Sequence, residues 1–190
     1  MVDSGSPVPV KPGYIGELRD TERAIALWHQ KSAEYGGPPP LAAFDFSRLD
    51  GGDCAYRFVI CADLAASPFF LVYGVQFARL LELPKTPSVG APLADHLPQR
   101  YLRLFNEGCE DAIARAHPVP MSGFVAHIDQ IELYRAAFMP LARSRKSTAR
   151  FVLGSFNRRI GPRISDADAV RQTRYWTWDN TQEPRYRNPL

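Results

Sequence analysis

Three cysteines and four histidines are the residues of this chain best suited to metal or nucleophilic chemistry. Cys54, Cys61 and Cys109 are odd in number and unevenly spaced, form no C-x-x-C pair, and none stands at zinc-ligand spacing from a histidine. The sequence therefore predicts no metal site, and it predicts free thiols in a reducing compartment. We expect a cytoplasmic protein, because there is no apolar signal segment and no apolar run near the ~20 residues of a membrane span.

Motifs for hydrolytic and phosphate chemistry are missing from the chain. The sequence contains no G-x-S-x-G, no H-E-x-x-H and no glycine-rich phosphate loop. Three neighbouring carboxylates, Glu107, Glu110 and Asp111, fall at the solvent-face spacing of one expected helix. We therefore predict no catalytic residue and a protein that is not an enzyme.

The charge balance is weak, with 23 Lys and Arg against 20 Asp and Glu, a net charge of +3. Such a balance does not favour nucleic acid as a partner. A basic stretch at 142–150 is interpreted as a solvated hairpin loop. Trp176 and Trp178 are costly to leave in water, so we expect 170–180 to dock on the domain or on a second subunit.

The elements that must position any site follow from hydrophobic periodicity. We expect three parts. Residues 1–19 are a Pro- and Gly-rich, flexible N-terminal segment, 20–160 are one domain that starts with a leader helix at 20–35, and 161–190 are a tail. Period-two runs predict strands at 55–61, 69–74, 124–128, 131–141 and 150–157, and helical spacing predicts helices at 76–83 and 99–116. The expected fold class is α+β, with a five-stranded antiparallel sheet and helices inserted between strands two and three.

A series of local motifs appears in the order seen in one known family. They are Leu27-Trp28 in the leader helix, Gly74 after the second strand, Gly90-Ala91-Pro92-Leu93 before the long helix, His117-Pro118 after it, and Leu133–Leu141 followed by Val152-Leu153-Gly154. Over about residues 20–160 the chain resembles a family of short bacterial single-PAS-domain proteins. The resemblance implies a sensory or regulatory module in signal transduction, whose sheet curls around a cavity closed by the middle helices.

The resemblance also implies where a ligand would bind. A small apolar ligand, a signalling protein partner or both are the expected partners. The expected lining residues are Phe70, Tyr73, Phe77, Leu81, Phe105, Ile113, Tyr134 and Phe138. Tyr73, Phe105 and Tyr134 should converge between the sheet and the long helix.

Some PAS domains hold haem or flavin, and neither is expected in this chain. His96 and His117 flank the long helix, and His127 lies on a predicted strand, so none is well placed as a haem ligand. The Asn106–Cys109 stretch lacks the spacing of flavin-binding light sensors, and Cys109 is interpreted as a buried structural thiol. We predict no cofactor.

The leader helix carries an apolar stripe that must be covered. Its members are Ala24, Leu27, Trp28 and Tyr35. The stripe packs either on the outer face of its own sheet or against the same helix of a twofold partner, and we expect the second arrangement, a homodimer.

Two other classes remain open at this point. One is an enzyme or small-ligand binder with the cone-shaped α+β fold of the ketosteroid isomerase type, in which Asp129 or His127 would be the base. The other is a protein-interaction module whose core is filled by its own side chains.

Overall fold

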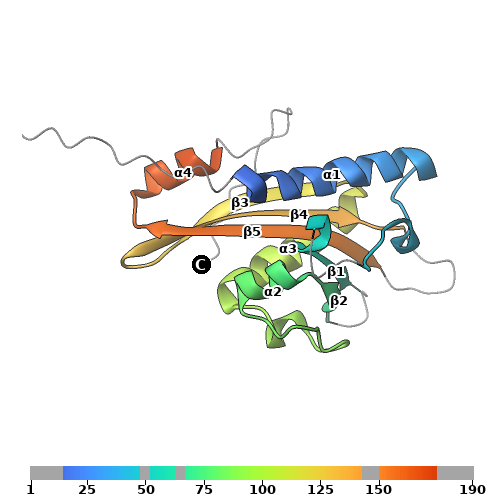
Figure 1. Ribbon diagram of the computed structural model, residues 1–190, viewed down its shortest axis with the longest axis horizontal. Helices are drawn as coiled ribbons and strands as arrows, with labels where there is room; N and C mark the ends of the chain where they lie inside the picture. The colour runs from blue at the N-terminus through green and yellow to red at the C-terminus, as the bar shows by residue number, and fades with distance from the viewer. Residues whose placement is uncertain (1–14, 48–51, 63–66, 143–149, 175–190) are drawn as a thin grey trace, which may run out of the picture.

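The computed structural model describes residues 15–47, 52–62, 67–142 and 150–174. Its helices and strands follow one another in the order shown in Figure 1. They are α1 (Ile15–Tyr35), β1 (Arg57–Cys61), β2 (Phe69–Tyr73), α2 (Val75–Leu81), α3 (Gln99–Arg115), β3 (Val119–Ala126), β4 (Gln130–Pro140), β5 (Phe151–Pro162) and α4 (Asp166–Arg174).

The strands form a single antiparallel sheet in the order β2-β1-β5-β4-β3. The first and last strands are therefore neighbours at its centre, with Phe58 opposite Gly154. This confirms the predicted α+β class and the five-stranded antiparallel sheet. None of the helices in the described ranges is long and apolar enough to cross a membrane.

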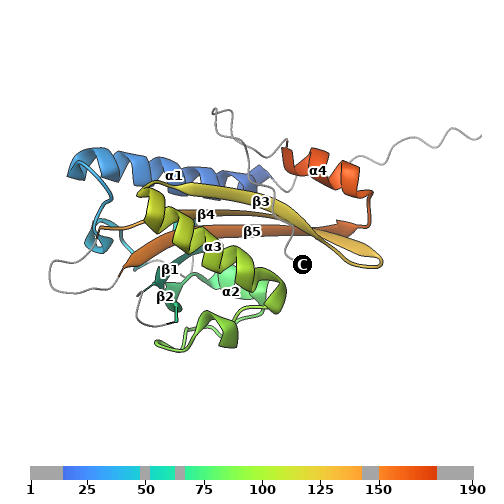
Figure 2. The ribbon, with the colours of Figure 1, turned by 180° about the vertical axis from the view of Figure 1, so that it is seen from behind.

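Helices cover both faces of the sheet. Figures 1 and 2 show α1 and α4 on one face, called here the outer face, and α2 and α3 on the other, the inner face. Strand alternation sends Tyr134, Ala136 and Phe138 inward and Ala137 and Met139 outward, so β4 contributes to two separate apolar clusters. The strand is consequently buried along nearly its whole length.

Three element boundaries differ from the sequence prediction by several residues. Helix α1 begins at Ile15, so Asp20 lies inside it, where its carboxylate accepts the Ser155 hydroxyl at 2.7 Å. Strand β3 begins at Val119 and includes Pro120, which a strand tolerates at the border of a sheet. Strand β5 extends to Pro162, and α4 occupies part of the predicted tail.

The far ends of three strands extend beyond α2 and α3. We call this part, residues 124–132 and 158–162, the arm. Its outer face is covered by α4, whose Ala169 packs with Phe124, Ile131 and Leu133. Its inner face lies next to the N-terminal end of α3.

Candidate functional site

The predicted lining residues lie together on the inner face. Seven of them are buried in one cluster, and Ile113 packs at its margin. Tyr73, Phe105 and Tyr134, expected to converge, belong to this same cluster between the sheet and α3. The pattern of apolar residues thus identified side chains that share one buried cluster.

Aromatic rings of the chain itself fill the middle of this cluster. The Phe105 ring lies 5.1–6.1 Å, centre to centre, from five other rings: Phe58, Phe70, Phe77, Phe138 and Phe156. Such separations are those of directly packed edge-to-face and tilted pairs.

Two buried glycines show how closely these rings are packed. A Cβ atom at Gly154 would lie 2.1 Å from the Phe58 ring, and one at Gly108 would lie 2.3 Å from Phe138. Glycine is required at both places because the neighbouring ring takes the volume of a side chain. This also explains why α3 has a glycine in its middle, where glycine is less favourable for a helix than alanine.

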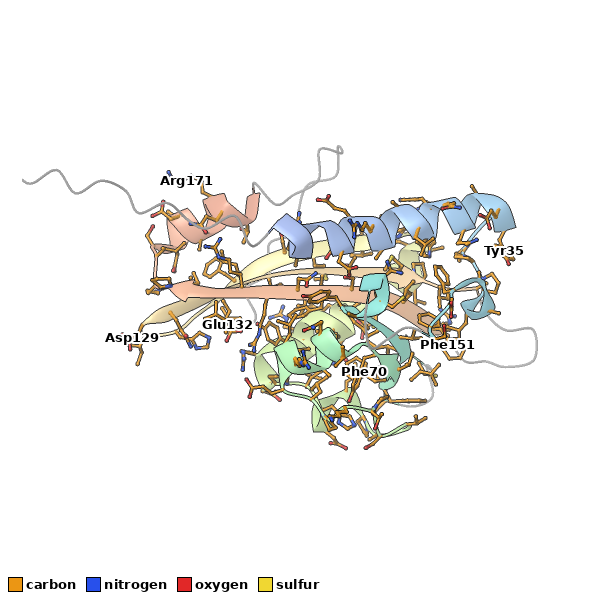
Figure 3. All side chains as sticks on the ribbon, viewed as in Figure 1. Tyr35, Phe70, Asp129, Glu132, Phe151 and Arg171 are labelled. Atoms are coloured by element: carbon orange, nitrogen blue, oxygen red, sulfur yellow. The ribbon has the colours of Figure 1, made fainter. Side chains whose placement is uncertain are left out.

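A charged cluster lies where the aromatic cluster meets the arm. Glu132 of β4 is buried, and its oxygens lie 3.1 Å from Arg158, 3.2 Å from Arg100 and 3.1 Å from His127. The Tyr101 hydroxyl also donates a hydrogen bond to Glu132. We call these five residues the Glu132 cluster; Figure 3 shows Glu132 beside the end of the helical layer.

Burial and charge act in opposite directions on this carboxylate. Burial works to raise the pKa of Glu132, but the hydrogen bond from Tyr101 and the charges of Arg158 and Arg100 outweigh it and hold the pKa below its usual range. The pKa of Tyr101 is raised by burial and by the same hydrogen bond. At neutral pH the cluster therefore holds an ionised Glu132 and a neutral Tyr101.

The cluster joins four separate parts of the fold. Arg100 and Tyr101 come from α3, Glu132 from β4, Arg158 from β5, and His127 from the β3–β4 turn. Its inner members are buried, whereas about a third of the Arg100 and His127 side chains remains exposed. The arrangement fixes α3 to the arm and presents two donors at the surface.

Exposed apolar side chains flank these donors. Ile128 at the β3–β4 turn is 93% exposed, and Ile160 on β5, opposite Glu132 in the ladder, is 45% exposed. We call Arg100, His127, Ile128 and Ile160 the arm surface. Large aliphatic side chains beside partly exposed polar side chains suit contact with another protein.

The sequence carried a signal for Glu132, the central residue of this cluster. Glu132 stands two residues before Tyr134, so it must share the inner face with Tyr134 and Phe138. A carboxylate at an inward position of a strand needs partners, and Arg158 lies on the same face of the adjacent strand. Only the fold reveals that Arg100, Tyr101 and His127 supply the rest.

The other residues weighed for chemistry lie elsewhere. Cys109 is fully buried in the aromatic cluster, and burial raises the pKa of its thiol, which favours the unreactive protonated form. His117 is exposed and lies beside Trp28 of α1, and His96 follows a short helical turn at Leu93–Asp95. Within the described ranges no three metal-ligating side chains are grouped to hold an ion.

The leader-helix stripe packs on the chain's own sheet. Ala24 and Trp28 are buried on the outer face, Leu27 packs beside them, and the Trp28 indole donates to the Pro140 carbonyl at 2.7 Å. Tyr35, 56% exposed, is the one member of the stripe that faces solvent. Of the two arrangements considered from the sequence, intramolecular packing is the one observed for this helix.

The tail is partly described. Helix α4 docks on the outer face of the arm through Ala169 and Thr173, both fully buried. The basic loop at 143–149 and the residues Trp176 and Trp178 lie outside the described ranges.

Searches of protein-family models and of curated proteins gave no match to this sequence.

Proposed function

We propose that this chain is a non-enzymatic, PAS-like regulatory module that acts by binding another protein through its arm surface. The observation that carries the proposal is the arm surface itself, on which Ile128 and Ile160 are exposed. The other two members of this surface, Arg100 and His127, are both paired with the buried Glu132. A buried, well-paired charged cluster beneath exposed apolar side chains gives a partner a fixed shape to recognise.

The PAS-like assignment is supported by the order of elements. Two strands precede a helical stretch, three strands follow it, and all five belong to one antiparallel sheet. In such a module the signal would pass through contact with a partner.

The cone-shaped enzyme alternative fits the geometry less well. Asp129 is exposed at the tip of the arm, as Figure 3 shows, and His127 is paired with Glu132 at 3.1 Å outside the aromatic cluster. A base for proton abstraction would have to reach an apolar cavity, and neither side chain lies in the aromatic cluster.

A small-ligand sensor is the second candidate, because seven of the eight predicted lining residues share one buried cluster. Its difficulty is that Phe105 already contacts five rings there. Native mass spectrometry of the protein as purified from its own cells separates the two candidates. The bare polypeptide mass supports the protein-binding module, and a stoichiometric apolar adduct supports the sensor.

Photo-crosslinking in the source cells tests the arm surface directly. A photoreactive amino acid replaces Ile128 in one strain and Val89, 65% exposed and outside the arm, in the control strain. We expect a discrete adduct of higher mass from position 128 that is absent from position 89 and is lost with Ile160→Lys. Equal labelling from the two positions would overturn the proposal.

A further inference from the structure

The two borders of the sheet are protected very differently. At the β2 border, Phe69 forms a bridge with Pro92, and the Leu93 amide donates to the Pro68 carbonyl at 2.8 Å. The ladder between β1 and β2 also shifts register between Val59 and Ile60. Coverage and irregular register both discourage the addition of another strand.

In the described ranges no loop or further strand is bonded to the β3 border. Its sequence, Val-Pro-Met-Ser-Gly-Phe-Val-Ala, contains no charged residue, and its register with β4 is continuous from Val119 to Ala126. Figure 2 shows β3 along one border of the sheet, with α1 and α4 on one side and α3 on the other. An uncharged, regular edge strand of this length is a template for pairing.

The phase of the ladder identifies the open backbone groups. The His127 amide donates to the Gln130 carbonyl at 2.9 Å, so the odd-numbered residues of β3 bond to β4. The amides of Ser122, Phe124 and Ala126 therefore point away from the sheet. In the described part of the chain no hydrogen bond reaches them.

Pro120 fits this phase. Its position is even-numbered, so the donor that proline lacks would have faced the open border and not β4. The β3–β4 ladder loses nothing by this proline, whereas a proline at an odd-numbered position would remove a bond.

We propose that β3 pairs antiparallel with β3 of a second copy of this chain, about a twofold axis at Gly123. In this register Ser122 bonds with Phe124 of the partner subunit and Ala126 with Pro120 of the partner subunit. The open amides all find carbonyl acceptors, and the missing donors of proline fall at the two ends of the new ladder. The same surface serves both copies, as a twofold interface requires.

The side chains favour this occupant. On the inner face Met121 lies opposite Val125 of the partner subunit, an apolar cross-strand pair, and Gly123 tolerates the close approach of a non-hydrogen-bonded pair on the axis. No like charges meet, because β3 carries none. The inference does not depend on the regulatory role proposed above.

Amide hydrogen exchange on the full chain tests the pairing residue by residue. We expect Ser122, Phe124 and Ala126 to become protected as protein concentration rises, in step with a dimer mass by light scattering. Gly123 and Val125 bond to β4 and should be protected at every concentration. Fast exchange of the three even-numbered amides at all concentrations would overturn the proposal.

Two variants at one position test the outward-facing amide donor of Ala126: one removes it and the other keeps it. Ala126 is exposed and its amide faces the border, so Ala126→Pro leaves the β3–β4 ladder intact, and Ala126→Ser keeps the amide. We expect the proline variant to raise the dimer dissociation constant about ten- to a hundredfold and the serine variant to leave it unchanged. A different result would refute the dimer: the three amides could be protected in a monomer at every concentration and lose this protection when residues 1–14 are deleted. The chain's own N-terminal segment, and not a second copy, would then pair with β3.

Discussion

The inner and outer faces of the sheet are both buried, but different interactions cover them. On the inner face the contacts are mainly between aromatic rings, with charged groups only at the margin next to the arm. On the outer face two apolar clusters, one under α1 and one under α4, are separated by buried polar side chains. Ring packing dominates the inner layer away from the Glu132 cluster, whereas directional bonds help to position the outer layer.

The polar strip of the outer face illustrates the second mode. Ser155 donates to Asp20 of α1, and the Arg135 guanidinium lies 3.7 Å from Glu22 on the same helix. Burial lowers the pKa of Arg135, and the Glu22 charge opposes this effect without overcoming it. Each such pair is satisfied in only one alignment of α1, so the strip specifies where the helix lies.

The largest effect should come from removing the central ring of the inner face. Phe105→Ala should lower the free energy of unfolding by about 4 kcal/mol, because the truncated side chain leaves a cavity among five rings. Urea denaturation measures the change. Phe105→Leu is the matched control and should lose clearly less, and a loss below about 1 kcal/mol for the alanine variant would contradict the filled core.

The second prediction concerns the charged margin of the inner face. Glu132→Gln should lower the free energy of unfolding at neutral pH by about 3 kcal/mol, because it removes the buried carboxylate 3.1 Å from the buried Arg158. The exposed Glu34→Gln on α1 is the control and should change stability little.

The pH dependence of the same pair of proteins gives a sharper test. The pKa of Glu132 is lowered in the folded chain, so its contribution is present above the unfolded value of about 4.3 and is lost as pH falls through the folded value. The stability difference between wild type and Glu132→Gln should therefore shrink as pH falls from about 6 to 3. A difference that stays constant over this range would show that the lost contribution is packing and not charge.

Sequence patterns predicted the parts of this molecule that depend on one element at a time. Alternation in 131–141 and helical spacing in 99–116 gave the strand, the long helix and the inward set from Phe70 to Phe138. These properties follow from the repeat of side-chain direction along a strand or helix. The fold class followed from the order of such elements.

Features that join distant segments could not be read in this way. The Glu132 cluster brings together α3, β4, β5 and a turn, and α1 packs on its own sheet because Trp28 reaches the carbonyl of Pro140, 112 residues later. An amphipathic stripe indicates that one face of a helix is buried, but it does not identify the surface that buries it. The leader helix was therefore expected to pack against a partner, because its stripe fits either a partner or the sheet.

The smallest predicted effect tests how far the outer face depends on a directional bond. Trp28→Phe keeps an aromatic ring under α1 but removes the indole donor, so the Pro140 carbonyl loses its 2.7 Å hydrogen bond. We expect a loss of about 2 kcal/mol in the free energy of unfolding, from the unsatisfied carbonyl and the smaller ring together. Ala26→Gln, exposed on the same helix, should leave stability within about 0.5 kcal/mol and serves as the control in parallel urea titrations. If Trp28→Phe were as mild as the control, α1 would be held by apolar contact alone, and the contrast between the two faces would not stand.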